Sequence, residues 1–121
     1  MIENILLLLI LLQIKHWYID FVNQSSIEVA SKGIYGDGAG VNHSAKHAIG
    51  TMICILCVTG LPYIAYAGVL AFIDFVTHYH IDWLKMNYGN RDTQTPSFWN
   101  HLGLDQMAHQ LCYLLIAYMI I

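Results

Sequence analysis

A histidine and an aspartate stand one helical turn apart at two places in this chain, each inside an apolar run. The pairs are His16–Asp20 and His78–Asp82, offset by 62 residues (78 − 16 = 62). Residues four apart share one face of a helix, so each pair directs an imidazole and a carboxylate the same way. A fold built from these runs must bury both pairs, which restricts it to helices that pack around a polar centre.

The apolar runs predict membrane-spanning helices. Of the 121 residues, 57% are hydrophobic and 11% charged, against roughly 25% charged in ordinary soluble proteins. About 20 apolar residues suffice for one span. We therefore predict a single all-α domain over residues 1–121, an antiparallel four-helix transmembrane bundle with helices at about 2–22, 43–59, 62–85 and 100–121. The 62-residue offset predicts that the bundle consists of two pseudo-symmetric helical hairpins.

Two polar stretches connect the predicted spans. Residues 23–42 are polar and glycine-rich and predict a flexible connector, and residues 86–100 form a second polar loop. Four of the five basic residues lie in or beside these stretches, which predicts cytoplasmic long loops and termini on the outside. The formal charge of −3 provides no basic surface for nucleic acid, so that class of partner is excluded.

Two further pairs, His43–His47 and Asp105–His109, repeat the 62-residue offset. At a rise of about 1.5 Å per residue, antiparallel packing brings one histidine from each helix to one level, about 18–24 Å from the terminal side. A second layer follows about 24–30 Å along the helices. The first layer contains His16, His47, His78 and His109, and the second contains Asp20, His43, Asp82 and Asp105.

These eight side chains supply five imidazoles and three carboxylates, enough for two divalent ions. Facing carboxylate and histidine pairs are how metal sites in bundle cores are built. Mixed nitrogen and oxygen donors favour zinc, with manganese or iron as alternatives. Two other interpretations stay open, namely a hydrogen-bonded network that fixes helix packing and a proton relay or ion pathway.

Other polar residues lie close to the two layers. Asp74 precedes His78 by one turn and is a candidate ligand or a neighbour of one; Asp74 and Asp20 are the candidate general bases. Lys46 and Lys85 are candidates for binding an anionic headgroup, although interfacial lysines need no such role. His101, before the fourth helix, is interpreted as a loop histidine rather than an entrance residue.

The chain carries four motifs in a fixed order: His16-x-x-x-Asp20-Phe21-x-x-Gln24, His43-x-x-x-His47, His78-x-x-x-Asp82-Trp83-Leu84-Lys85 and Asp105-Gln106-x-x-His109. Together they resemble the domain-of-unknown-function 3307 family, small integral membrane proteins of bacteria and phages. The pattern is also similar to membrane-bound metal-dependent hydrolases. The resemblance covers nearly the whole chain and implies a bacterial inner-membrane location, but the family name implies no reaction.

The leading hypothesis is a membrane-embedded hydrolase with two divalent ions that acts on a phosphoester or lipid-linked ester near the cytoplasmic interface. The alternative is a non-catalytic, metal-stabilised scaffold that binds a protein partner or self-associates as a homo-oligomer. A closed ligand shell would indicate structure, and an open metal position would indicate catalysis. A transporter would need a polar path across the bilayer, whereas polarity here lies on one side.

Overall fold

The computed structural model describes residues 2–121, and this part of the chain is helical throughout its regular elements, which confirms the all-α class. A π-helical turn extends the first helix, and a 3₁₀ turn precedes the fourth. The elements are α1 (Ile2–Trp17), η1 (Tyr18–Val22), α2 (Ser26–Ser31), α3 (Gly38–Thr59), η2 (Leu61–Tyr63), α4 (Ile64–Tyr88) and α5 (Pro96–Ile120).

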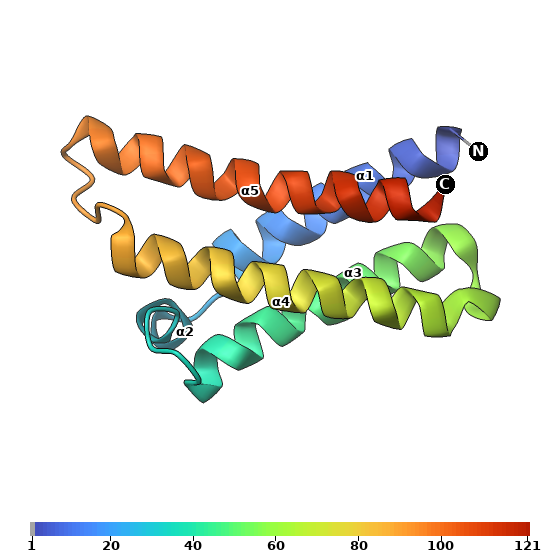
Figure 1. Cartoon of the computed structure of the whole chain (residues 1–121), viewed down its shortest axis with the longest axis horizontal. Coiled ribbons are helices and arrows are strands. Elements are labelled where there is room, and N and C mark those ends of the chain that lie inside the picture. The colour runs from blue at the N-terminus through green and yellow to red at the C-terminus, as the bar shows by residue number, and fades with distance from the viewer. Residues whose placement is uncertain (1) are drawn as a thin grey trace.

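The four long helices close into a ring in which α1 packs on α3, α3 on α4, α4 on α5 and α5 on α1. Figure 1 shows both termini at the end of the bundle that holds the α3–α4 turn, with α2 and the α4–α5 loop at the opposite end. Gly60 makes the turn with φ of 84°, a conformation that glycine adopts without steric cost. Pro62 follows in η2 and cannot continue α3.

The stretch predicted to be a flexible connector contains α2 and the start of α3. Ser25 and Glu28 form a capping box, in which the Ser25 hydroxyl accepts from the Glu28 N–H and a Glu28 carboxylate oxygen accepts from the Ser25 N–H. Asp37 caps α3 by accepting from the Ala39 N–H at 2.9 Å. Helix α3 therefore begins at residue 38 rather than near 43, and α5 begins at a proline, at residue 96 rather than near 100.

The interior changes in character along the bundle axis. Toward the termini, the buried side chains form an apolar core of Leu8, Leu12, Cys54, Ile55, Ala67, Leu70, Tyr113, Ile116 and Ala117. Toward the long loops, the buried positions belong mainly to histidine, aspartate and lysine. One end of the bundle is thus held together by apolar packing, and the other end by polar contacts.

The outward faces of the long helices are apolar, with exposed side chains such as Ile10 on α1, Ile53 on α3, Phe72 on α4 and Leu111 on α5. Within residues 2–121, two segments are long and apolar enough to cross a membrane: Ile2–Val22 and Leu61–Tyr88, with mean hydropathies of 1.8 and 1.3. Insertion of all four helices, and their orientation, stay predictions.

Candidate metal centre

Histidines and aspartates from the four long helices and η1 converge inside the bundle in three overlapping groups. Within each group, one nitrogen or oxygen atom per residue lies within 4.8 Å of the others. The structure thus brings together all eight ligand candidates, and each is 5% exposed or less. The groups are Asp20, His43, His47 and His78; His16, His78 and His109; and Asp82, Asp105 and His109.

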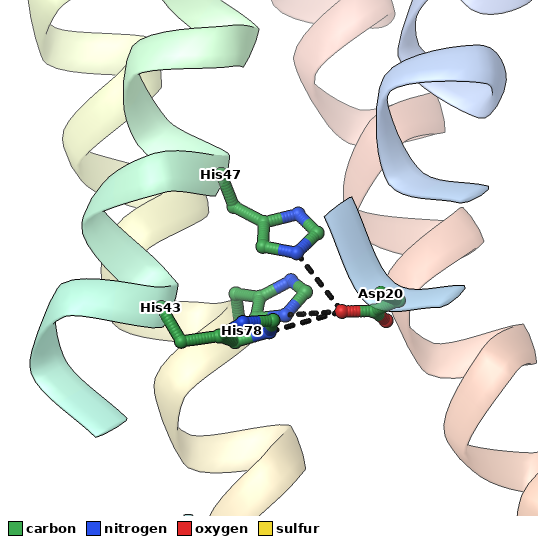
Figure 2. Close-up of side chains that lie close together, drawn as sticks. All are labelled: Asp20, His43, His47 and His78. Atoms are coloured by element: carbon green, nitrogen blue, oxygen red, sulfur yellow. Dashed lines mark hydrogen bonds and ion pairs between the residues drawn. The ribbon is translucent and has the colours of Figure 1, made fainter. Parts of the chain in front are cut away.

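Asp20 lies at the centre of the first group, as Figure 2 shows. Its Oδ1 is 3.0 Å from Nε2 of both His43 and His47, and 3.6 Å from Nε2 of His78. Its Oδ2 is 3.2 Å from Nε2 of His16. Asp20 lies in the π-helical turn η1, a geometry that is rare in proteins and frequent at functional sites. One carboxylate therefore contacts histidines from three helices.

The third group is held together more loosely. His109 Nε2 is 3.5 Å from Asp82 Oδ1 and 3.5 Å from Asp105 Oδ1, and His78 Nε2 is 3.4 Å from Asp82 Oδ2. Nitrogen-to-oxygen hydrogen bonds normally measure 2.7–3.2 Å, so these contacts are too long. Within residues 2–121, Nε2 of His78 and His109 and Oδ1 of Asp82 and Asp105 have no hydrogen-bond partner.

These unpartnered atoms fit a divalent ion. Leaving a buried polar atom without a partner costs free energy, and such atoms are rare in folded proteins. Ligands about 2.0–2.1 Å from one tetrahedral zinc ion lie about 3.3–3.4 Å from each other, which is close to the 3.5 Å that separates His109 Nε2 from Oδ1 of Asp82 and from Oδ1 of Asp105. The donor set and its spacing are therefore ones that could hold a metal ion.

Two glutamines that the motifs include also contact the centre. Gln106 Oε1 is 3.1 Å from Nε2 of His16, and its amide nitrogen donates to Asp105 Oδ2 at 3.0 Å. The Gln24 amide donates to the backbone carbonyl of Asp20, a group near the end of η1. Gln24 and Gln106 belong to the same motifs as Asp20 and Asp105, but the sequence alone indicated no function for either glutamine.

Lysines balance part of the negative charge. Lys32 Nζ lies 2.9 Å from Asp82 Oδ2 and 3.8 Å from Asp20 Oδ1, and Lys85 Nζ lies 2.9 Å from Asp105 Oδ2. Lys32 was missed because it falls in the stretch predicted to be a flexible connector. These ion pairs are the observation that favours a polar network without a metal, since ammonium groups already partner the carboxylates.

A second polar cluster lies behind the histidines. Lys15 Nζ is 3.0 Å from Asp74 Oδ2, 3.1 Å from the Tyr113 hydroxyl and 3.4 Å from Nδ1 of His47. The Tyr113 hydroxyl is 2.8 Å from Nδ1 of His16. Contacts at Nδ1 fix the ring so that Nε2 faces the centre, as partners of metal-bound histidines do. Asp74 lies in this cluster and outside the three ligand groups.

Gly50 provides the space through which Lys15 reaches that cluster. A Cβ at this position would lie 2.7 Å from Lys15 Cγ and 2.9 Å from its Cδ. Gly50→Ala is expected to lower the free energy of unfolding by about 1–3 kcal/mol, because the lysine must move away from its partners. The matched control is Gly68→Ala in α4, where nothing lies within 4 Å of the added Cβ.

The control is expected to stabilise the protein by up to about 1 kcal/mol, the usual gain when alanine replaces glycine within a helix. Denaturant unfolding of both variants in detergent micelles makes the comparison. Equal stability changes in the two variants would contradict the proposed path of the Lys15 side chain.

The structure separates the two lysines predicted to bind a headgroup. Lys46 Nζ lies 2.6 Å from Glu28 Oε1 and 3.3 Å from Asn23 Oδ1, outside the ligand groups. Burial acts to raise the pKa of Glu28, but the hydrogen bonds from Lys46 and the Ser25 backbone outweigh it and hold this pKa at about 2. Glu28 therefore stays ionised at neutral pH. Lys85, in contrast, contacts Asp105 of the third group.

Residues 6–121 match a family model described as "Protein of unknown function (DUF3307)". No curated protein and no solved structure matches the chain.

Proposed function

Because the chain belongs to the DUF3307 family of proteins of unknown function, we propose its function from the site itself: a membrane-embedded protein that holds divalent metal ions. The supporting observation is the set of buried atoms without hydrogen-bond partners, namely Nε2 of His78 and His109 and Oδ1 of Asp82 and Asp105. An ion beside His109 Nε2 would also partner Oδ1 of Asp82 and Asp105, each 3.5 Å from that nitrogen, and His78 shares a second ligand group with His109. Zinc suits the donors best, with manganese or iron as alternatives.

The distribution of polar and apolar side chains supports a membrane location. A soluble protein buries apolar side chains and leaves charges in water. Here apolar side chains cover the outer faces of the long helices, whereas several charged side chains, among them Asp20, Asp74 and Asp82, are buried. Charged side chains within membrane segments normally face the bundle interior and pair there, as Asp20 and Asp82 do. We place the long-loop end, which holds the basic residues, on the cytoplasmic side.

Hydrolysis of a phosphoester or lipid-linked ester is the activity that this centre would support. Bound divalent ions would lower the pKa of a water toward about 7 and bind the attacking and leaving oxygens. A cavity of about 270 Å³ reaches the centre at Asp105 and is also lined by Lys85 and His101. Lys85 would there attract an anionic ester. Of the two candidate bases, Asp20 lies among the ligand groups, whereas Asp74 is held by Lys15.

A metal-stabilised scaffold is the second candidate, and the burial of the ligands favours it. Each of the eight candidate ligand residues is 5% exposed or less, and structural metal sites are closed in this way while catalytic sites keep an open position. In this case the bound ions would fasten the helices together, and the apolar outer faces would mediate self-association or bind a partner helix.

Elemental analysis of the detergent-purified protein tests metal binding. We expect about two divalent ions per chain after purification without chelators, and a lower unfolding temperature after chelation, because an ion bound only by the folded state stabilises that state. Fewer than one ion per chain would refute the metal proposal. Metal-dependent release of phosphate from a panel of phospholipids would then assign the hydrolase, and stabilisation by metal without turnover would assign the scaffold.

A further inference from the structure

A larger cavity lies at the long-loop end of the bundle, beside the metal centre. Its volume is about 550 Å³, and it is bounded by α2, the end of α4, the α4–α5 loop and the start of α5. Figure 1 shows these segments together at the end opposite the termini. The polar residues that line it include Lys85, Arg91 and His101, whereas its apolar lining includes Val29 and Leu102.

The cavity carries unbalanced positive charge. Among residues 2–121, Arg91 forms no ion pair with a carboxylate, and the one hydrogen bond of its guanidinium is to the weak acceptor Sδ of Met86, at 3.4 Å. His101 accepts the Asn90 backbone N–H at Nδ1, at 2.8 Å, so a neutral ring carries its proton on Nε2 and can donate from there. A planar guanidinium beside an N–H donor suits the oxygens of a phosphate group.

Two side chains of the cavity connect it with the candidate metal centre. Lys85 and His101 line both this cavity and the smaller one of about 270 Å³ that reaches Asp105. Lys85 donates to Asp105 Oδ2 at 2.9 Å, and Asp105 belongs to the third ligand group. An anion held by Arg91 and His101 would therefore lie one side chain away from the ligands.

We propose that this cavity binds the phosphate end of an amphiphilic phosphoester, with its apolar part along Val29 and Leu102. Arg91 and His101 contact the phosphate, and Lys85 lies between it and the ligand group. A volume of about 550 Å³ is within the range of small-molecule sites, which combine apolar walls with a few polar groups. The claim that the bound phosphoester is a substrate rests on the proposed function, but the claim that the cavity binds it does not.

Calorimetric titration of the full chain in a neutral detergent tests the proposal. The probes are dihexanoyl phosphatidic acid, the uncharged dihexanoylglycerol and inorganic phosphate. We expect the phosphatidic acid to bind at least tenfold more tightly than either of the other two. Arg91→Gln is expected to weaken its binding at least tenfold, and Ala30→Trp, which fills the cavity without changing its charge, is expected to do the same.

Lys46→Gln removes one positive charge outside the cavity and is the comparison for Arg91→Gln. Equal losses of affinity in these two variants would mean that general charge attraction causes the binding, and would overturn the proposal. An Arg91→Gln protein with the affinity of the parent would overturn it as well. If inorganic phosphate bound as tightly as phosphatidic acid, the proposal that the ligand has an apolar part would be overturned. If the protein holds no metal but binds phosphatidic acid through Arg91, the proposed function is refuted and the cavity site is retained. If it holds metal but shows no Arg91-dependent binding, the cavity site is refuted and the metal-binding function is retained.

Discussion

Replacing Asp20 with alanine is expected to reduce the metal content from about two ions per chain to one or fewer. Asp20 is the carboxylate that His16, His43 and His47 all approach within 3.2 Å, so its loss removes the shared ligand of the first group. The free energy of unfolding should fall by about 3–5 kcal/mol, the usual cost of removing one partner from a buried polar cluster. Elemental analysis and denaturant unfolding measure the two effects.

Glu3→Ala provides the control for Asp20→Ala, because Glu3 is an exposed carboxylate on α1, the helix that the Asp20 turn extends. We expect it to change the metal content by nothing measurable and the stability by less than about 1 kcal/mol, since only a favourable contact with the helix N-terminus is lost. An Asp20→Ala protein that keeps both ions would show that the carboxylate is a packing group and that the ions lie elsewhere.

Lys15→Met is expected to lower the free energy of unfolding by about 3–5 kcal/mol. The substitution leaves Asp74 buried without its ammonium partner, and an unpaired buried charge is among the most costly changes in a protein interior. Within the described residues 2–121, only the Thr51 hydroxyl, which donates to Asp74 at 2.5 Å, would remain among its side-chain partners. Denaturant unfolding in detergent micelles measures the loss.

The double variant Lys15→Met/Asp74→Leu tests the cause of that loss. Replacing a whole buried ion pair by apolar groups is often neutral or stabilising, so the double variant should recover most of the stability. Its metal affinity should still fall by about 10–100-fold, because His47 loses the Lys15 contact at Nδ1 and the Tyr113 hydroxyl that orients His16 loses its own contact with Lys15. A double variant no more stable than Lys15→Met would mean that the lysine stabilises the fold by packing rather than by charge.

The sequence predicted the contents of the polar centre because helical periodicity is a strong constraint. The spacing within each of the four pairs, such as His16–Asp20 and His78–Asp82, places both members on one helix face. In an apolar environment such a polar face has to point into the interior of the bundle. The rise per residue along antiparallel helices then predicted that the four pairs lie at similar depths in the bundle. These steps need no tertiary information, and the structure does bring the eight side chains together. Their role as metal ligands stays a prediction.

The surroundings of the centre could not be predicted in the same way. Lys32 reaches Asp82 only because α2 folds back over the end of the bundle, and that path depends on tertiary packing. A local signal for α2 existed, since Ser25 and Glu28 have capping-box spacing, but the glycine-rich composition obscured it. The π-helical turn around Asp20 has no sequence signature of this kind. The cavity beside Arg91 lies between α2 and the stretch 85–102, which are distant in sequence.

The division of ligands between the two halves of the chain has a consequence for how the protein assembles. The first group takes Asp20, His43 and His47 from the segment before Gly60, but it is completed by His78 from α4, and the second group likewise spans both halves. The amino-terminal hairpin alone cannot form either group, because His78 and His109 are synthesised after it. If the protein binds ions as proposed, tight binding to these two groups would therefore have to wait until the two hairpins dock.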